Sequence, residues 1–345
     1  MDLVTLWFWL IALTFTLYFF LEGFDFGVDL LRPVLARNEA EERALVGTIG
    51  PFWDGNEVWV IAAAGLMFST FPVWYGALFS GMYPVFVVIL LSLLLRGVSF
   101  EYRNQVDQPR WRNFWDWMSF LGSLIPSFCW GLTMAKLIEG LPINADQRVV
   151  GGVLDLFTPF SVVGGLATLL LFILHGANFL LLRLHQDTEL YGRARAAALR
   201  IGALATAAIL AFVVMGYVTE GLFVTFGLLP WLFPLAAGLT LGSIWFGLST
   251  RRDVLAFVMS SLTIVFSTVT VFIALYTRQT VLPSTVDPAF GLGLRESASQ
   301  PYTLVLMTWV GGIFLPLILG YQIWTYTVFR GRVRPDEGGL NKGYD

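Results

Sequence analysis

Long apolar stretches, separated by short polar connections, make up most of the chain. A helix rises about 1.5 Å per residue, so roughly 20 apolar residues are enough to cross the hydrocarbon core of a bilayer. Nine stretches meet this requirement and are predicted to be membrane-crossing helices. They cover approximately residues 5–30, 50–70, 76–96, 114–137, 158–183, 201–221, 226–248, 255–276 and 303–328.

The composition supports this interpretation. Of the 345 residues, 57% are apolar and 13% are charged, and the mean hydropathy is +0.72. A soluble domain usually has about 25% charged residues. We therefore expect an all-α polytopic membrane protein, with one transmembrane domain over residues 1–330 and a polar, mobile tail over 331–345. The net charge of −3 is too small to indicate nucleic acid or a generally anionic surface as a partner.

The basic residues are distributed unequally between alternate connections. With nine helices, 17 of the 21 Lys and Arg residues lie on one side of the membrane and four on the other. Because cytoplasmic connections carry the excess of Lys and Arg, we expect the N-terminus outside and the C-terminus in the cytoplasm. The larger group is Arg32, Arg37, Arg43, Arg96, Arg103, Arg110, Arg112, Arg183, Arg193, Arg195, Arg200, Arg251, Arg252, Arg330, Arg332, Arg334 and Lys342, and the smaller is Lys136, Arg148, Arg278 and Arg295.

Charged residues gather at the cytoplasmic ends of the first four predicted helices. In the first helix, Gly23 and Gly27 form a small-xxx-small step that lets another helix approach closely beside a face of carboxylates. Carboxylates are costly inside a membrane and therefore often functional. The gathered residues are Glu22, Asp25 and Asp29 in the first helix, Asp54 and Glu57 in the second, Arg96, Glu101 and Arg103 at the end of the third, and Arg112 and Asp116 at the start of the fourth.

Two interpretations of these residues remain open. Asp29, Glu101 and Asp116 are also typical of interfacial anchors or salt bridges, and Asp54 is suited to cap the second helix. Asp25 and Glu57 lie deeper than their neighbours, which favours a functional role. Buried carboxylates open to the cytoplasm are suited to carry protons.

The sequence offers few metal or haem ligands. His185 lies in a cytoplasmic connection, and His175 lies within the fifth helix, where we expect it to form an interhelical hydrogen bond. One intramembrane histidine cannot supply a bis-histidine haem site. The single cysteine, Cys129, lies in an apolar run and is expected to be a small buried hydrophobe. The chain itself is therefore expected to bind neither haem nor metal.

Four segments carry a family resemblance: LEGFDFGVDLL (21–31), GPFWDGNEVWVI (50–61), RGVSFEYRNQVDQPRWRNFWDW (96–117) and SASQPYTLVLMTWVGG (297–312). Together they resemble subunit II of cytochrome bd-type quinol oxidases, in order and over nearly the whole chain. The chain is similar to the shorter members of that family, which include the cyanide-insensitive branch.

The resemblance implies a fold of two four-helix bundles plus one peripheral helix, in a prokaryotic plasma membrane. It implies that subunit I of the complex carries haems b558, b595 and d, oxidises quinol and reduces O₂ to water with protons taken from the cytoplasm. Subunit II is implied to bind no haem, to support assembly of subunit I and to contact membrane lipid. A structural quinone in this chain and a small accessory subunit are compatible with the family.

The resemblance also assigns roles to residues. In the family, carboxylates at the positions of Asp25, Asp54 and Glu101 are associated with a proton route from the cytoplasm toward the haems, although some relatives carry Asp at position 101. Our hypothesis adds Glu57 to this route. The supporting residues are Trp53, Asn56 and Trp59, which position the route and pack against the partner, and Arg96 and Arg103, which pair with its carboxylates.

Two other classes of function compete with this hypothesis. A proton-coupled transporter is compatible with nine helices and intramembrane carboxylates, but transporters usually have broken helices near the midplane of the membrane. A purely structural subunit, in which the polar cluster serves assembly only, is the other alternative.

Overall fold

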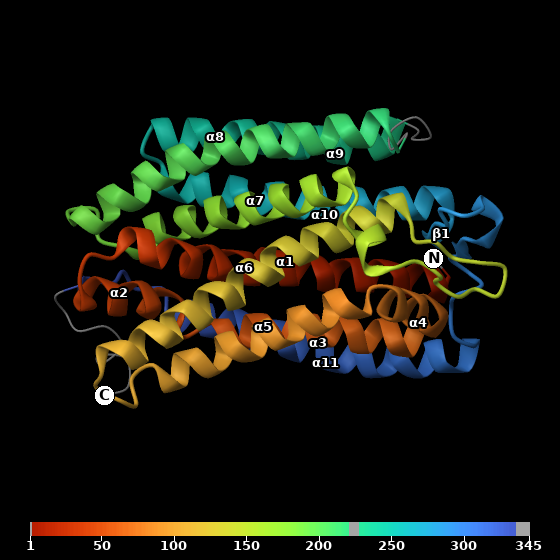
Figure 1. The fold of residues 1–345 in the computed structure, drawn as a ribbon, viewed down its shortest axis with the longest axis horizontal. Helices are drawn as coiled ribbons and strands as arrows, with labels where there is room; N and C mark the ends of the chain where they lie inside the picture. Colours follow the sequence, from red (N-terminus) through yellow and green to blue (C-terminus); the bar gives the residue numbers. More distant parts are fainter. Residues whose placement is uncertain (1, 221–227, 336–345) are drawn as a thin grey trace.

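A computed structural model describes residues 2–220 and 228–335, which are mainly helical (Figure 1). The long helices are α1 (Leu3–Leu35), α3 (Trp53–Thr70), α5 (Tyr83–Tyr102), α6 (Pro109–Glu139), α7 (Pro159–Arg183), α8 (Glu189–Val218), α9 (Leu228–Ser249), α10 (Asp253–Arg278) and α11 (Pro301–Val328). The short elements are α2 (Glu39–Ile49), α4 (Pro72–Gly81), the 3₁₀ helices η1 (Val153–Leu156) and η2 (Pro288–Phe290), and the antiparallel strands β1 (Thr280–Leu282) and β2 (Leu292–Gly293).

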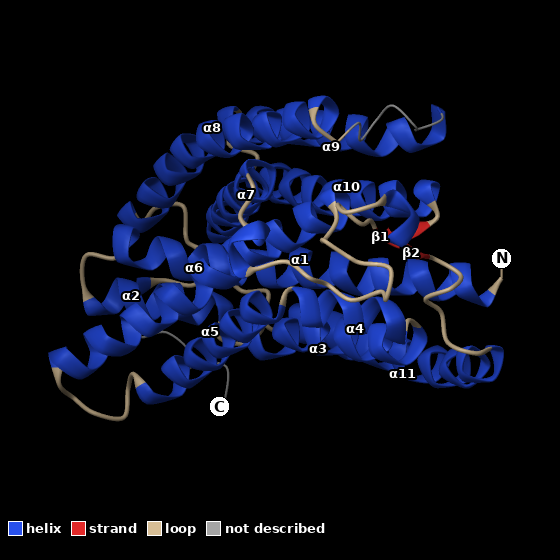
Figure 2. Cartoon of the chain, turned by 45° about the vertical axis from the view of Figure 1, so that its right-hand side comes forward, coloured by secondary structure: helices blue, strands red, loops and turns tan. Residues whose placement is uncertain are grey.

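The long helices lie side by side along the longest axis of the molecule (Figures 1 and 2). Helices α8 and α9 form the outermost layer on one side, and α3, α5 and α11 lie on the opposite side. Helix α1 runs between these layers and packs against α3, α6, α7 and α10. Of its 33 residues, 22 are buried, so α1 is the central helix of the fold.

Helices α1 and α7 approach each other closely through glycines. A Cβ atom at Gly27 would lie 2.0 Å from the carbonyl oxygen of Phe172, and one at Gly176 would lie 2.4 Å from the carbonyl carbon of Gly27. A Cβ atom at Gly23 would lie 2.8 Å from the ring of Phe172. The glycine step of the first helix therefore does admit another helix, and that helix is α7.

Eight of the described helices are long and apolar enough to cross a membrane, which indicates an integral membrane protein. They are α1, α5, α6, α7, α8, the Trp231–Ser249 part of α9, α10 and α11. Helix α3, the second of the nine predicted crossings, is not among them. It has 18 residues and carries Asp54 and Glu57 near its start, which lowers its hydropathy.

The structure divides the region 39–102 differently from the predicted stretches. The stretch predicted as one helix over 76–96 is divided between α4 and α5, with Pro72 and Pro84 in the first turns of the two helices. Proline lacks a backbone N–H and therefore favours the first turn of a helix. The predicted helix over 50–70 begins at Trp53, and the preceding helix α2 was not predicted at all. Its amphipathic surface contains too many charges to resemble a membrane crossing.

The start of the tail and the two long connections are held to the rest of the structure by backbone hydrogen bonds. The backbone N–H of Val333 donates to the carbonyl oxygen of Arg183 at 2.6 Å, and Arg332 donates to that of Leu184 at 2.7 Å. The mobile tail predicted over 331–345 is thus anchored through residue 334, and 336–345 lie outside the described residues. At the other end of the molecule, Leu141 donates to the carbonyl oxygen of Pro283 at 3.0 Å and so joins the two long connections.

Candidate functional site

Arg96 of α5 lies at the centre of a buried ionic cluster between α1, α3 and α5. Its Nε atom donates to Asp29 Oδ2 at 2.9 Å, and Nη1 forms an ion pair with Glu22. Nη1 also lies 3.5 Å from Oε2 of Glu57. The guanidinium lies over the ring of Phe26, 4.9 Å from its centroid. Arg96 is fully buried, so its charge is compensated entirely by these protein groups.

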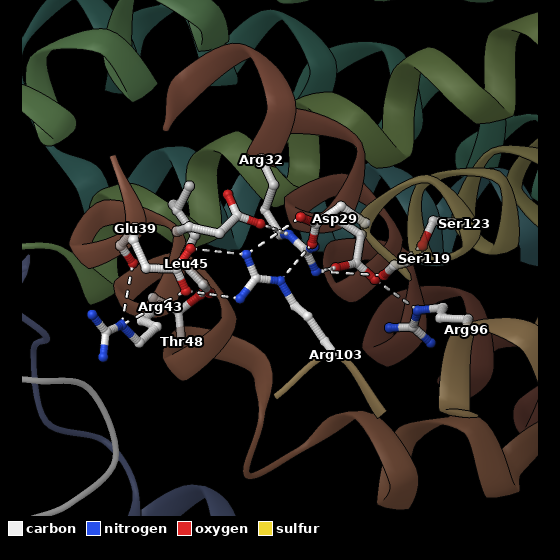
Figure 3. A network of polar contacts seen from close by, with 12 residues as sticks. Asp29, Arg32, Glu39, Arg43, Leu45, Thr48, Arg96, Arg103, Ser119 and Ser123 are labelled. Atoms are coloured by element: carbon white, nitrogen blue, oxygen red, sulfur yellow. Dashed lines mark hydrogen bonds and ion pairs between the residues drawn. The ribbon is translucent and has the colours of Figure 1, made fainter. Parts of the chain in front are cut away.

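Asp29 connects this cluster to a second arginine. Its Oδ1 accepts from Arg32 Nη1 at 2.9 Å, and its Oδ2 accepts from Ser123 of α6 at 3.0 Å (Figure 3). Arg32 in turn donates to Glu42 of α2 at 2.8 Å and to Asp116 of α6 at 2.9 Å. Arginine provides several donors in a planar arrangement, which suits it to join carboxylates from three helices.

The buried Arg103 connects the network to the partly exposed Glu39. Arg103 donates from Nε to Asp116 Oδ1 at 2.6 Å and from Nη1 to Glu39 of α2 at 2.9 Å. The hydrogen bonds from Arg103 hold the pKa of Glu39 below its usual value. A continuous chain of alternating charges therefore runs from Glu22 in the interior to Glu39 at the surface.

Asp25 belongs to a separate polar group between α1, α3 and α11. Its Oδ2 accepts from Asn56 Nδ2 at 2.7 Å, whereas its buried Oδ1 has no hydrogen-bond partner among the described residues. Asn56 Oδ1 accepts from Gln322 Nε2 at 2.7 Å and from the hydroxyl of Tyr326 at 2.8 Å. Asn56 thus joins a carboxylate of α1 to two side chains of α11.

The remaining predicted residues of the proton route lie at graded depths. Asp54 and Glu101 are exposed, and neither makes a side-chain hydrogen bond or ion pair with another described residue. The side chain of Glu57 is 20% exposed and reaches Arg96. The structure therefore brings Glu57 to the ionic cluster, whereas Asp54 and Glu101 lie at the surface.

The predicted aromatic residues flank Asn56 on α3. Trp53 stacks on Phe100 of α5 with 5.0 Å between ring centroids. Trp59 is buried, and its indole N–H has no hydrogen-bond partner among the described residues. Trp53 therefore packs within the chain, between α3 and α5.

Several residues of the site were not among the predicted site residues. Glu22 and Asp29 were noted on the carboxylate face of the first helix, but the sequence did not indicate that both are buried. Gln322 and Tyr326 carried no signal, because they lie in the last apolar stretch and more than 260 positions from Asn56. Glu39 and Glu42 were missed together with helix α2.

His175 does not fit the role of a haem ligand. Its Nδ1 lies 2.8 Å from the hydroxyl of Ser260, and its Nε2 lies 3.1 Å from the carbonyl oxygen of Phe20. The ring also stacks on Phe257 with 4.9 Å between centroids. Both nitrogens are therefore engaged in interhelical contacts. Within residues 2–220 and 228–335, no group of three or more His, Cys, Asp or Glu side chains is arranged to hold a metal ion.

The chain is similar in sequence to subunits of cytochrome bd oxidases. The family model for cytochrome bd terminal oxidase subunit II matches residues 3–329. The chain is 39% identical over 338 residues to cytochrome bd ubiquinol oxidase subunit 2 of Bacillus subtilis (strain 168). The alignment covers 97% of this chain and 98% of the Bacillus subtilis protein. It is 32% identical over 365 residues to cytochrome bd-I ubiquinol oxidase subunit 2 of Escherichia coli (strain K12). That alignment covers 96% of this chain and 95% of the Escherichia coli protein.

A solved structure shares the fold. A chain in the structure of bd oxidase from Geobacillus thermodenitrificans superimposes with a TM-score of 0.73 at 16% identity, covering 95% of this chain and 98% of that one. The four sequence segments had indicated the same family. The chain therefore belongs to the cytochrome bd terminal oxidase subunit II family.

Proposed function

We propose that this chain is the haem-free subunit II of a quinol:O₂ oxidoreductase, which supports assembly of a haem-bearing subunit I and supplies it with protons from the cytoplasm. Membership of the family makes the chain a subunit of an oxidoreductase complex. The observation that carries the proton route is the series of carboxyl groups at increasing depth. Glu101 and Asp54 are exposed, Glu57 is half-buried and Asp25 is fully buried.

Charge balance supports a role in holding protons. Asp29 is paired with both Arg32 and Arg96. The charge of Arg96 is thus partly compensated by Asp29, and the three other carboxyl groups near it, Glu22, Asp25 and Glu57, have no second arginine to balance them. Burying uncompensated carboxylates costs several kcal/mol each, and a bound proton removes that cost. Glu22 Oε2 and Asp25 Oδ1 are buried and without hydrogen-bond partners in the described structure. These atoms are suited to exchange protons with water or with a group of the partner subunit.

Helix α3 has an exposed surface that is suited to contact subunit I. The exposed residues Asp54, Val58, Ile61, Gly65 and Phe68 follow one another at helical spacing and form a single stripe. An unpaired carboxylate at the end of a lipid-facing stripe is unfavourable. We propose that subunit I covers this stripe, and that α3 completes a nine-helix topology of two four-helix bundles and the peripheral helix α11, with the N-terminus outside.

The structural quinone that the family allows has a suitable cavity. A cavity of about 530 Å³ lies between α1, α3, α7, α10 and α11 and is lined mainly by aromatic and aliphatic side chains. Trp59 lines this cavity, and its buried indole N–H has no hydrogen-bond partner among the described residues. Solvent extraction of the purified complex would then recover quinone in stoichiometric amount, and Trp59→Phe would reduce the recovery.

A proton-coupled transporter is less favoured by the same observations. The carboxyl groups of the site lie toward one end of α1 and at the first turns of α3, rather than at breaks near the middle of crossing helices. Solute uptake by the isolated chain in liposomes, together with an absence of haem in the purified material, would support the transporter instead.

Substitution of Asp25 tests the proton route in the purified complex. We expect Asp25→Asn and Asp54→Asn each to lower quinol-dependent O₂ consumption at least about tenfold with the haem spectrum retained, because an amide cannot carry a proton. Asp146→Asn, in the exposed connection after α6, is the matched control. Normal O₂ consumption by both site variants would refute the proton route, and loss of haem alone would support the structural alternative.

A further inference from the structure

We propose that Gln322 and Tyr326 of α11 are positioning residues that fix the orientation of the Asn56 side-chain amide and thereby keep its N–H directed at Asp25. This inference rests on the proposed role of Asp25 in holding protons. It assigns a role in the site to the peripheral helix.

The hydrogen bonds of Asn56 define a single orientation of its amide. A primary amide has two N–H donors and an oxygen that accepts two hydrogen bonds. The oxygen receives both from α11, at 2.7 Å from Gln322 and 2.8 Å from Tyr326. The N–H₂ group faces two acceptors of α1, at 2.7 Å from Asp25 and 3.4 Å from the carbonyl oxygen of Leu21. If the amide were flipped, its N–H₂ group would face the donors of Gln322 and Tyr326, and its oxygen would face the acceptors on α1.

The burial pattern of α11 supports a specific role for this contact. Leu304 and Gln322 are the only buried residues in the described α11. Gln322 is 8% exposed, whereas the preceding Tyr321 is 62% exposed. A buried glutamine on an otherwise exposed apolar helix is costly unless it meets a polar partner, and Asn56 is that partner. The Tyr326 ring stacks on Phe52 with 4.4 Å between centroids, which places its hydroxyl at Asn56.

The orientation of Asn56 affects which protonation state of Asp25 is favoured. A donated N–H stabilises the carboxylate, whereas a flipped amide would present its oxygen and stabilise the protonated acid. The other titratable or charged groups that act on Asp25 are Glu22 and Asp29 on α1, Glu57 on α3, Arg96 on α5 and Tyr326 on α11. Of these groups only Tyr326 contacts the Asn56 amide, so a flip of Asn56 leaves the positions of Glu22, Asp29, Glu57 and Arg96 unchanged.

Two nearly isosteric substitutions separate hydrogen bonding from packing. Tyr326→Phe keeps the ring stacked on Phe52, and Gln322→Met keeps the length of the side chain, but each removes one donor to Asn56. Either single change leaves one donor on the amide oxygen, whereas the double variant leaves none. In the purified complex we expect the pH midpoint of quinol-dependent O₂ consumption to move to higher pH by about half a unit or more in the double variant, and by less than half of that shift in each single variant.

Asn56→Leu provides the reference for an effect that acts through Asn56. We expect it to move the pH midpoint at least as far as the double variant does. Adding Tyr326→Phe and Gln322→Met to Asn56→Leu is expected to produce no further shift. Tyr321→Phe, the same chemical change at an exposed position of α11, is expected to leave the pH profile unchanged.

The outcomes distinguish this inference from the proposed function. An unchanged pH profile in the double variant or in Asn56→Leu, or a further shift in the Asn56→Leu background, would overturn the positioning role even where Asp25→Asn abolishes turnover. Normal turnover and an unshifted pH profile in Asp25→Asn would instead refute the role of Asp25, on which the inference depends. Haem content, measured in every variant, corrects turnover for differences in assembly.

Discussion

Arg96 and Asp29 form an ion pair of 2.9 Å in which both side chains are completely removed from solvent. The pair joins α5 to α1 and forms part of a network of three arginines that reaches the surface at Glu39. A buried ion pair adds little net stability compared with a well-packed apolar pair, but loss of one partner leaves the other charge uncompensated. The network is therefore sensitive to single substitutions.

Replacement of Arg96 by Met should strongly destabilise the complex. Glu22 and Asp29 would lose a shared cation in the interior, and removing one partner of a buried pair typically costs about 3–5 kcal/mol. The expected result is a marked loss of assembled, haem-containing complex and a lower unfolding temperature. Arg43→Met is the matched control, because the Arg43 side chain is 58% exposed and its ion pair with Glu39 is long. Equal stability of the two variants would contradict the compensating role of Arg96.

The contact between α1 and α7 should be similarly intolerant of an added methyl group. At Gly27 a Cβ atom would overlap the backbone of α7, which cannot move aside as a flexible side chain can. Overpacking of this kind typically costs about 1–3 kcal/mol of stability. Because the obstacle is backbone, we expect Gly27→Ala to lower the stability by about 3 kcal/mol or more. Thermal unfolding of the purified complex measures the change. Gly192→Ala on α8, where no atom lies within 4 Å of an added Cβ atom, should be neutral or slightly stabilising because Ala favours helix more than Gly does. A similar loss of stability there would mean that the loss at Gly27 does not come from overpacking.

The glycine step and the site differ in how far sequence alone predicts them. The spacing of Gly23 and Gly27 predicts a close helix contact, because spacing along one helix determines which residues share a face. It does not identify α7 as the partner, since that depends on how distant helices pack. Asp25 stands out as a carboxylate in an apolar stretch. Gln322, by contrast, is a neutral residue whose role follows only from a contact with Asn56, 266 positions away.

Helix α2 and the division of the predicted third crossing illustrate a second limit. A search for long apolar stretches detects helices that face lipid, and α2 is a short charged helix outside that class. Its Glu39 and Glu42 complete the ionic network, so the surface end of the site was missed with it. The division at residue 82 follows from prolines that start helices within a continuously apolar segment.

Substitution of His175 should leave the haem spectrum unchanged. His175→Gln supplies an amide N–H that can replace the donor to the carbonyl oxygen of Phe20, so we expect normal absorption by haem d in the purified complex. His175→Leu removes the interhelical hydrogen bonds to the carbonyl oxygen of Phe20 and to the hydroxyl of Ser260 and should cost about 1–3 kcal/mol of stability. The absorption spectrum separates the two effects, because a ligand role would require loss of a haem band in His175→Gln.

Acidification should weaken the surface end of the network through Glu39. Arg103 lowers the pKa of Glu39 in the folded chain below its value in the unfolded chain, which is about 4.3. The stabilisation is therefore complete above that pH and is lost as the pH falls through the folded-state pKa. The Glu39 side chain is 35% exposed and its ion pair lies near the surface, so the contribution is below about 1 kcal/mol.

Glu39→Gln tests this dependence by differential unfolding of the complex between pH 7 and pH 2, a range that extends below the lowered pKa of Glu39. The variant should be slightly less stable than the wild type at pH 7, because a neutral amide pairs more weakly with Arg103 than a carboxylate does. Below the folded-state pKa the wild-type side chain is protonated as well, so the difference should shrink toward zero as acid is added. Asp146→Asn, which removes a carboxylate that has no side-chain partner among the described residues, should show no such convergence. A constant difference across the pH range would mean that Glu39 acts through packing rather than through its charge.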